Sequence, residues 1–304
     1  MTAIDLDGVT KRYGDVLALN DLDLTIDEGE IFGFLGPNGA GKSTTINILL
    51  DFVRPTAGSV EVLGMDARTD SQEIRARTGV LPEGFQVYER LTGRQHVQFA
   101  IESKEVDQDP DALLQRVDLL DAADRKAGGY SKGMKQRLTM AMALVGDPEL
   151  LILDEPTTGL DPRGAREVRD IVREERDRGA TVFFSSHILG QVEAVCDRVG
   201  ILREGELVAV DTIEGLRDAA GDGSKLTVSV DVATDEAVEA VRSVDGVQEV
   251  TVRDSTLSVA CEEGAKTRVI STIEDAGVTV EDFSTEETSL EDLFMAYTGE
   301  EGRR

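Results

Sequence analysis

Positively charged residues are scarce in this chain. It has 32 lysine and arginine residues against 60 aspartate and glutamate residues, so its net charge is −28, and lysine itself occurs at only eight positions. A nucleic-acid-binding protein needs a basic surface that displaces counterions from the phosphates, and adsorption to anionic lipid also needs basic residues. The composition therefore argues against both kinds of binding, and we expect no nucleic-acid partner.

The same acidic and lysine-poor composition suits a cytoplasm with concentrated salt. At 1 M salt the Debye length falls to about 3 Å, so the repulsion among the many carboxylates is screened. We interpret the composition as a hypothesis about habitat, in which the protein is most stable and active at high salt.

Cysteine and long apolar runs are scarce as well. Cys196 and Cys261 lack any paired spacing, so we expect reduced thiols in the core rather than a disulfide or a metal site. The longest apolar stretches are far shorter than the roughly 20 residues that span a bilayer, and the N-terminal residues do not form a signal peptide. We therefore expect a cytoplasmic protein that reaches a membrane only through a partner.

Residues 1 to about 220 alternate short apolar strands with helical segments. This pattern is typical of an α/β fold with a largely parallel sheet. The helical pattern from about 85 to 146 predicts an inserted helical lobe. Nearly continuous apolar runs predict strands that are covered on both faces; they lie at 30–36, 149–155, 180–186 and 198–204.

A second domain is expected over residues 221–304. The polar stretch 217–224 indicates a linker, and the segments from 225 to 284 follow the order β-α-β-β-α-β, which indicates a small α+β ferredoxin-like unit. The segment 289–299 predicts a closing helix. Its apolar side chains share one face, and we expect that face to dock onto a core; they are Leu290, Leu293, Phe294 and Tyr297.

The stretch 36–44, GPNGAGKST, fits the phosphate-binding pattern G-x-x-x-x-G-K-[ST]. It follows an apolar strand and precedes a helix, so its backbone N–H groups and the positive end of the helix dipole can meet phosphate oxygens. We expect Lys42 to reach the β- and γ-phosphates and Ser43 to bind Mg²⁺. The nucleotide-binding residues predicted in this loop are Gly36, Pro37, Asn38, Gly39, Ala40, Gly41, Lys42, Ser43 and Thr44.

Two other predicted strands end in polar side chains. Asp154 and Glu155 end the strand 149–155, and adjacent buried carboxylates are costly unless they meet a cation or take part in proton transfer. We expect Asp154 to hold Mg²⁺ and Glu155 to polarise the attacking water. His187 follows the strand 180–186, where ligands of open α/β sheets gather, and is expected to sense the γ-phosphate. His96 is expected to have no partners and to serve only packing or the surface.

The stretch 129–137, GYSKGMKQR, is a cationic helix start that Ser131 is expected to cap. Together with LLILDEP at 150–156 and TGLDP at 158–162, it resembles the ATP-binding cassette (ABC) family, whose signature is usually L-S-G-G-Q. The resemblance covers residues 1 to about 220. Ser131 and Gly133 retain the signature, whereas Tyr130, Lys132 and Met134 depart from it.

The resemblance implies roles for three further residues. Tyr13 would stack on the adenine ring, although an aromatic residue in a strand can equally be a packing residue. Glu83 stands where the family usually has glutamine and would contact Mg²⁺ or the attacking water. Asp161 would communicate between paired cassettes.

The resemblance also implies cofactors and partners, namely ATP and Mg²⁺, a second copy of the chain, and a separate membrane permease on whose cytoplasmic face the chain would sit. Two ATP molecules would lie between the copies, with Ser131 and Gly133 of one facing the phosphate loop of the other. The variant signature and the appended domain favour an exporter (ABC-2) type, whose permease would dock near residues 84–92. There Phe85, Tyr88 and Leu91 are either anchors for the permease or part of a packed loop.

Two other functions stay open at this point. One is a soluble cassette ATPase that acts on a cytosolic protein or nucleoprotein assembly. The other is a nucleotide-dependent scaffold without turnover, which the presence of Glu155 and His187 disfavours.

Overall fold

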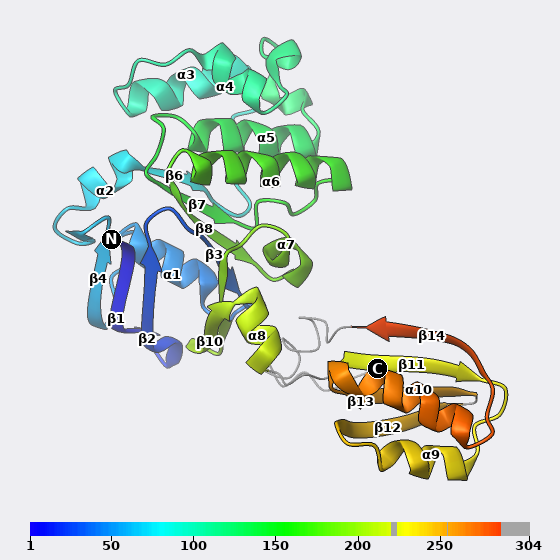
Figure 1. Cartoon of the computed structure of the whole chain (residues 1–304). Helices are drawn as coiled ribbons and strands as arrows, with labels where there is room; N and C mark the ends of the chain where they lie inside the picture. The colour runs from blue at the N-terminus through cyan, green and yellow to red at the C-terminus, as the bar shows by residue number, and fades with distance from the viewer. Residues whose placement is uncertain (220–223, 254, 287–304) are drawn as a thin grey trace. The chain divides into compact units, whose positions relative to one another are not determined.

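The computed structural model describes residues 1–219, 224–253 and 255–286 (Figure 1). The chain divides into two compact units, Met1–Thr212 and Ile213–Arg304. The boundary expected at 220/221 follows the polar linker in the composition, and the helix α8 (Ile213–Ala219) lies between the two positions. The closing helix expected at 289–299 lies outside the described residues.

The first unit contains a six-stranded sheet with the order β10-β9-β3-β8-β7-β6. All neighbouring pairs are parallel except β9 and β10, which form an antiparallel hairpin. Every residue of β3, β7 and β8 is buried, as expected for strands covered on both faces. The strands are β3 (Ile31–Leu35), β6 (Thr78–Leu81), β7 (Leu150–Asp154), β8 (Thr181–Ser186), β9 (Arg198–Arg203) and β10 (Glu206–Thr212).

A second sheet of this unit, antiparallel and with the order β2-β1-β4-β5, was not predicted from the sequence. It shares one hydrophobic core with the parallel sheet: Phe34 and Phe183 cluster with Ile4, Leu22 and Ile46 of the helix α1. The bounds are β1 (Thr2–Tyr13), β2 (Val16–Asp27), α1 (Lys42–Leu49), β4 (Ala57–Val62) and β5 (Met65–Asp66).

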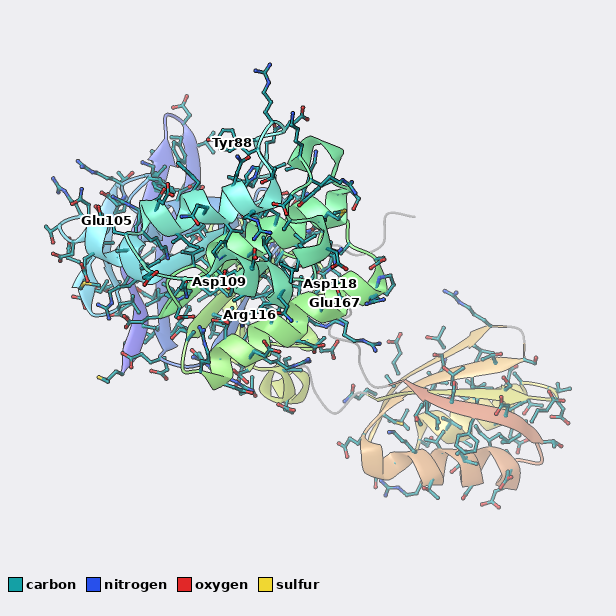
Figure 2. The ribbon with its side chains drawn as sticks, turned by 90° about the horizontal axis from the view of Figure 1, so that it is seen from above. Tyr88, Glu105, Asp109, Arg116, Asp118 and Glu167 are labelled. Carbon is teal, nitrogen blue, oxygen red and sulfur yellow. The ribbon has the colours of Figure 1, made fainter. Side chains whose placement is uncertain are left out.

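The helical lobe includes α3 (Gly93–Ser103), α4 (Pro110–Arg116) and α5 (Lys132–Ala143). Helix α5 packs against β6 of the parallel sheet, and Figure 1 shows α3 and α4 on the outer side of α5. Arg116, at the end of α4, lies 2.5 Å from Glu175 of α6, and Arg137 of α5 lies 3.7 Å from Glu167 of α6. Figure 2 labels Arg116 and Glu167. These ion pairs join the lobe to the sheet-bearing part of the unit. Outside the lobe, this unit also has the helices α2 (Ser71–Arg77), α6 (Pro162–Asp177) and α7 (Leu189–Glu193).

The expectation that His96 has no partners is wrong. Only 1% of His96 is exposed. Its Nε2 accepts the backbone N–H of Tyr88 at 2.9 Å, its Nδ1 lies 2.7 Å from the carbonyl oxygen of Thr92, and its ring stacks on that of Tyr88. His96 therefore fixes the loop that carries Tyr88, a contact that depends on how the loop folds back onto α3.

The second unit has the predicted ferredoxin-like order. Its four strands are all antiparallel in the order β12-β13-β11-β14, and its own core includes Leu226, Val241, Val259 and Ile273. Cys261 of this core and Cys196 of the first unit are both buried, as expected. The elements are β11 (Ser224–Val230), α9 (Asp235–Arg242), β12 (Val247–Arg253), β13 (Thr256–Cys261), α10 (Lys266–Asp275) and β14 (Val280–Glu286).

Candidate functional site

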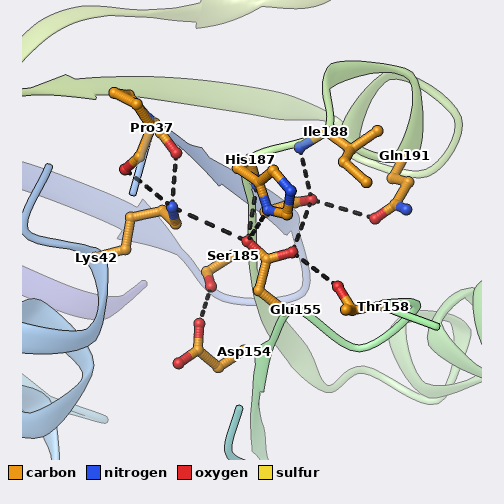
Figure 3. A network of polar contacts seen from close by, with 11 residues as sticks. Pro37, Lys42, Asp154, Glu155, Thr158, Ser185, His187, Ile188 and Gln191 are labelled. Atoms are coloured by element: carbon orange, nitrogen blue, oxygen red, sulfur yellow. Dashed lines mark hydrogen bonds and ion pairs between the residues drawn. The ribbon is translucent and has the colours of Figure 1, made fainter. Parts of the chain in front are cut away.

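The carboxyl ends of three neighbouring parallel strands meet at one place (Figure 3). Leu35 of β3 pairs with Ser186 of β8, and Asp154 of β7 pairs with Ser185 of β8, so the residues that follow these strands are brought side by side. Lys42 Nζ lies 4.0 Å from Glu155 Oε1, and the same oxygen lies 2.7 Å from His187 Nδ1. The expected convergence of the three strand ends is present.

The phosphate loop needs glycine where its backbone passes close to other strands. A Cβ on Gly36 would lie 2.5 Å from the carbonyl oxygen of Leu202, and one on Gly41, whose φ is +118°, would lie 2.8 Å from that of Ala18. Gly39 also has positive φ but no atoms close to its Cβ position. The loop is therefore held between β2 and β9 and is open at Gly39, where a phosphate can approach the backbone.

The side chain of Lys42 lies inside this loop. Its buried ammonium donates to the carbonyl oxygens of Gly36 at 2.6 Å and Pro37 at 3.3 Å. Burial lowers the pKa of Lys42, while the nearby carboxylates of Glu155 and Asp154 act in the opposite direction. The loop is thus folded around a positive charge, which suits an entering polyphosphate.

Asp154 is a buried carboxylate with 6% exposure. It accepts a hydrogen bond from the Ser185 hydroxyl, and burial raises its pKa, with a further rise from the charge of Glu155. Sequence reasoning missed Ser185, although its polar side chain in an apolar strand was a usable signal. A carboxylate whose charge is disfavoured in this way is stabilised by a cation.

The residues expected to bind Mg²⁺ share one cavity. Asp154, Ser43 and Glu83 all line a cavity of about 500 Å³ between α1 and β6. Within the described ranges no group of three or more His, Cys, Asp or Glu side chains is arranged to hold a metal. Mg²⁺ needs no such group, because it keeps several waters and is usually held by one or two carboxylates plus substrate phosphates. The residues present therefore fit Mg²⁺ that arrives with a nucleotide.

Glu155 sits at the turn that leaves β7, with 4% exposure and a φ of +51°. Positive φ is uncommon for residues other than glycine and is found at functional turns. Its Oε1 accepts the backbone N–H of His187 at 2.9 Å, and its Oε2 lies 3.2 Å from the Thr158 hydroxyl and 3.5 Å from the Ser186 hydroxyl. These donors orient the carboxylate, and sequence reasoning missed both hydroxyl groups.

The helix start at 129–137 is capped as predicted. Ser131 is the N-cap of α5, and its hydroxyl accepts the backbone N–H of Met134 at 3.2 Å. The first turn of α5 carries no acidic residue, so its positive dipole end is not neutralised. Tyr130 is buried, with its hydroxyl donating to the carbonyl oxygen of Ala122, so it serves packing where the usual signature has leucine.

The signature residues lie in a different cavity from the predicted metal ligands. Ser131, Gly133 and Asp161 line a cavity of about 490 Å³, and this cavity shares no lining residue with the one that contains Asp154. Asp161 also caps α6, since its carboxylate accepts the backbone N–H of Gly164 at 2.7 Å. The phosphate loop residue Ser43 and the signature residue Ser131 thus line separate cavities of one chain.

Tyr13 lies at the end of β1, where its ring is partly exposed. The ammonium of Lys11 is 4.8 Å from the ring centroid. The contact between this antiparallel sheet and the phosphate loop is made further along, by Ala18 and Leu19 of β2 against Gly41. The adenine role of Tyr13 therefore stays a prediction.

Two family models match the chain. The model described as ABC transporter matches residues 19–158, and the model described as the C-terminal domain of DrrA1-3-like ATP-binding proteins matches residues 212–298. The daunorubicin resistance ATP-binding protein DrrA2 of Streptomyces coeruleorubidus is 37% identical over 98% of this chain and 95% of its own length. The linearmycin resistance ATP-binding protein LnrL of Bacillus subtilis is 30% identical over 97% of this chain and 98% of its own length.

Two solved structures of ATP-binding cassettes are similar to this chain. An ATP-binding subunit of an ABC transporter superposes with a TM-score of 0.67 and 29% identity, over 72% of this chain and 94% of that one. A dimeric ATP-binding cassette in a post-hydrolysis state, bound to ADP and Pi, superposes with a TM-score of 0.64 and 25% identity, over 69% of this chain and 98% of that one.

Proposed function

The chain belongs to the ATP-binding cassette family of transporter ATPases, and from this premise we propose that it is the ATP-hydrolysing subunit of a membrane exporter. The support comes from relatives that match along nearly its full length and are named for drug resistance, and from relatives of the first unit named for bacitracin transport and Nod factor export. The alternative of a soluble cassette that serves a cytosolic assembly has no such support.

The site residues have different roles in ATP hydrolysis. The backbone of residues 36–44 and the ammonium of Lys42 hold the phosphates, and Glu155 accepts the proton of the water that attacks the γ-phosphate. His187 keeps the Glu155 carboxylate in place through two contacts to Oε1. Ser43, Asp154 and Glu83 would hold Mg²⁺, which supplies positive charge beside the phosphate oxygens when it is bound.

A second copy of the chain would complete each site. The separate cavities of Ser131 and Asp154 carry this proposal, because one chain presents a phosphate loop and a signature that do not share a cavity. Two copies related by a twofold axis place each signature against the phosphate loop of the other. Two ATP molecules would then lie in the interface, each held by both chains.

The permease is proposed to dock beside the Mg²⁺ cavity. The far side of that cavity is lined by apolar residues that include Phe52 and Phe85, and Phe52 and Tyr88 are 64% and 60% exposed. Exposed aromatic side chains next to an apolar hollow are typical anchors for a partner protein. Leu91, also expected as an anchor, is half-buried. Among the described helices none is long and apolar enough to cross a membrane, so we propose action at the cytoplasmic face through this partner.

Two measurements test the proposal. Lys42→Ala should weaken binding of a fluorescent ATP analogue, whereas Lys266→Ala, on α10 of the second unit, should leave it unchanged. The affinity-tagged full chain should co-purify from detergent-solubilised membranes with a protein of about six spanning helices. Recovery with ribosomes or with a cytosolic scaffold would instead support the soluble alternative.

A further inference from the structure

We propose that Gln136, on α5, positions the general base Glu155 and so makes hydrolysis of this chain's own ATP respond to the nucleotide held by its partner copy. The proposal deepens the proposed function and rests on it, because it requires the two-copy arrangement. Gln136 is a positioning residue: it touches neither the nucleotide nor the water, and it acts through the backbone that carries Glu155.

The central contact joins α5 to the residue directly after the base. The side-chain amide of Gln136 donates from Nε2 to the carbonyl oxygen of Pro156 at 3.0 Å. Pro156 is buried, so its carbonyl oxygen needs a partner, and this amide supplies it. Loss of the amide would free one end of the turn at Glu155.

The backbone of the turn is bonded within itself and to β8: the N–H of Thr158 donates to the carbonyl oxygen of Glu155 at 3.1 Å. The N–H of Glu155 donates to the carbonyl oxygen of Ser185 at 3.1 Å, which fixes the turn to β8, whereas Pro156 has no N–H to donate. The positive φ of Glu155 is held by these bonds on either side. Gln136 therefore bonds the turn to the helical lobe, and Ser185 of β8 bonds it to the sheet.

Two further contacts place α5 against the same segment. The side chain of Lys132 lies where a Cβ on Gly159 would be, and a Cβ on Gly133 would lie 3.4 Å from Cδ2 of Leu160. A shift of the first turns of α5 therefore moves residues 156–160 with it.

The same segment, residues 156–160, also contacts the carboxylate of Glu155. Thr158 donates its hydroxyl to Oε2 of Glu155 at 3.2 Å (Figure 3). Ser131, which would face the partner's γ-phosphate, lies at the N-terminal end of the same rigid helix as Gln136. When Ser131 binds the nucleotide of the partner copy, α5 moves toward that nucleotide. The contacts of α5 with residues 156–160 then orient the Glu155 carboxylate toward the ATP bound by this chain. The two sites become coupled through one helix and one turn.

The experiment uses the full chain with Gln136→Met, which keeps the length of the side chain and removes the amide. Affinity for a fluorescent ATP analogue should be unchanged, kcat should fall about tenfold, and the Hill coefficient for ATP should fall toward one. Gln98→Met is the matched control, since Gln98 bonds only Glu102 on α3 in the described structure, and should retain both values. Wild-type kcat and Hill coefficient in Gln136→Met would overturn the proposal.

A second pair of variants, at Thr158, distinguishes a positioning role from a loss of folding. Thr158→Val should lower kcat with unchanged nucleotide affinity and melting temperature, and Thr158→Ser, which keeps the hydroxyl, should restore kcat. If Gln136→Met or Thr158→Val lowers affinity and melting temperature together with kcat, the residues are structural and the proposal fails.

The proposed function is tested separately in the same series. Glu155→Gln with ATP should form a dimer by size-exclusion chromatography whether Gln136 is present or replaced by methionine. If Glu155→Gln stays monomeric while Gln136→Met behaves as wild type, the two-copy arrangement itself is rejected. If the dimer forms but Gln136→Met shows wild-type kinetics, only the positioning role is rejected.

Discussion

Oε1 of Glu155 meets His187 twice, at 2.7 Å from the ring nitrogen Nδ1 and at 2.9 Å from the backbone nitrogen that donates to it. The two residues follow neighbouring parallel strands, β7 and β8, so their relative position is set by the sheet rather than by a loop. With Nδ1 committed to the carboxylate, Nε2 is the nitrogen left to meet a ligand. The Glu155 carboxylate and the His187 ring are therefore held in a fixed relative position.

Glu155→Gln should separate ATP binding from hydrolysis. Glutamine keeps the shape of the side chain but cannot accept the proton of water, so hydrolysis should fall by roughly 10²–10⁴-fold while ATP binding is retained. Phosphate release measures hydrolysis, and equilibrium binding of a fluorescent ATP analogue measures ATP binding. Glu73→Gln, at an exposed position on α2, is the control; unimpaired turnover by Glu155→Gln would reject the assigned base.

Ser131→Arg should leave ATP binding by the isolated chain intact and abolish dimer formation and turnover. The bulky cation would occupy the space in front of the α5 N-terminus that we assign to the partner's γ-phosphate. Equilibrium binding of a fluorescent ATP analogue and ATP-induced dimerisation of the Glu155→Gln chain check the two halves. Ser103→Arg, at an exposed position on α3, should change neither, and loss of binding by monomeric Ser131→Arg would mean that the motif belongs to the wrong site.

Asp154→Asn should stabilise the nucleotide-free chain at neutral pH. Because burial raises the pKa of Asp154, the stability that its protonation contributes is complete below the ordinary aspartate pKa, about 3.9, and is lost as pH rises through the raised pKa. Asparagine has no charge to bury. The free energy of unfolding of the Asp154→Asn chain should therefore exceed that of the parent by about 1 kcal/mol at pH 7.5.

Urea unfolding without nucleotide measures this difference. It should shrink as the pH is lowered toward 4.5, and Mg²⁺-dependent hydrolysis should be lost at every pH. Asp107→Asn, at an exposed position, serves as the control. An equal stability of Asp154→Asn and the parent at both pH values contradicts the assigned cause.

Glu175→Ala should destabilise the chain far more than Glu174→Ala. Glu175 has no exposure and bonds Arg116 and Arg178 with its two oxygens, so its removal leaves two arginines without their buried partner. We expect a loss of about 3 kcal/mol in the free energy of unfolding. Glu174 is 64% exposed and 3.4 Å from Arg116, so its loss should cost less than about 1 kcal/mol. Equal losses in denaturant unfolding would show that burial of the Glu175 pair contributes nothing.

The parallel sheet and the three strand ends were predicted well from the sequence, because the signals for both lie in short continuous stretches of the chain. The apolar runs of β3, β7 and β8 are continuous, and the residues that carry the chemistry follow them directly. The antiparallel sheet of β1 and β2 was not predicted, because its strands alternate buried and exposed residues with several irregularities of register. Such interrupted alternation gives a weak strand signal.

The supporting residues of the site were predicted less well. Ser185, Thr158 and Gln136 act through hydrogen bonds to Asp154, Glu155 and Pro156, and two of these bonds join residues 31 and 20 positions apart. No local motif encodes a contact that arises only when strands and helices are packed. The same holds for His96, whose contact with the Tyr88 backbone forms only when the loop folds back.

The position of Lys42 in the phosphate loop affects the rate at which ATP associates with the chain. Its ammonium lies against the carbonyl oxygens of Gly36 and Pro37, so these bonds hold the loop in shape from within the chain itself. A loop of that kind loses little conformational freedom when it is occupied. The rate of association is then set by the encounter of two negatively charged molecules, ATP and a chain of charge −28, and dissolved salt that screens their repulsion should make the encounter faster.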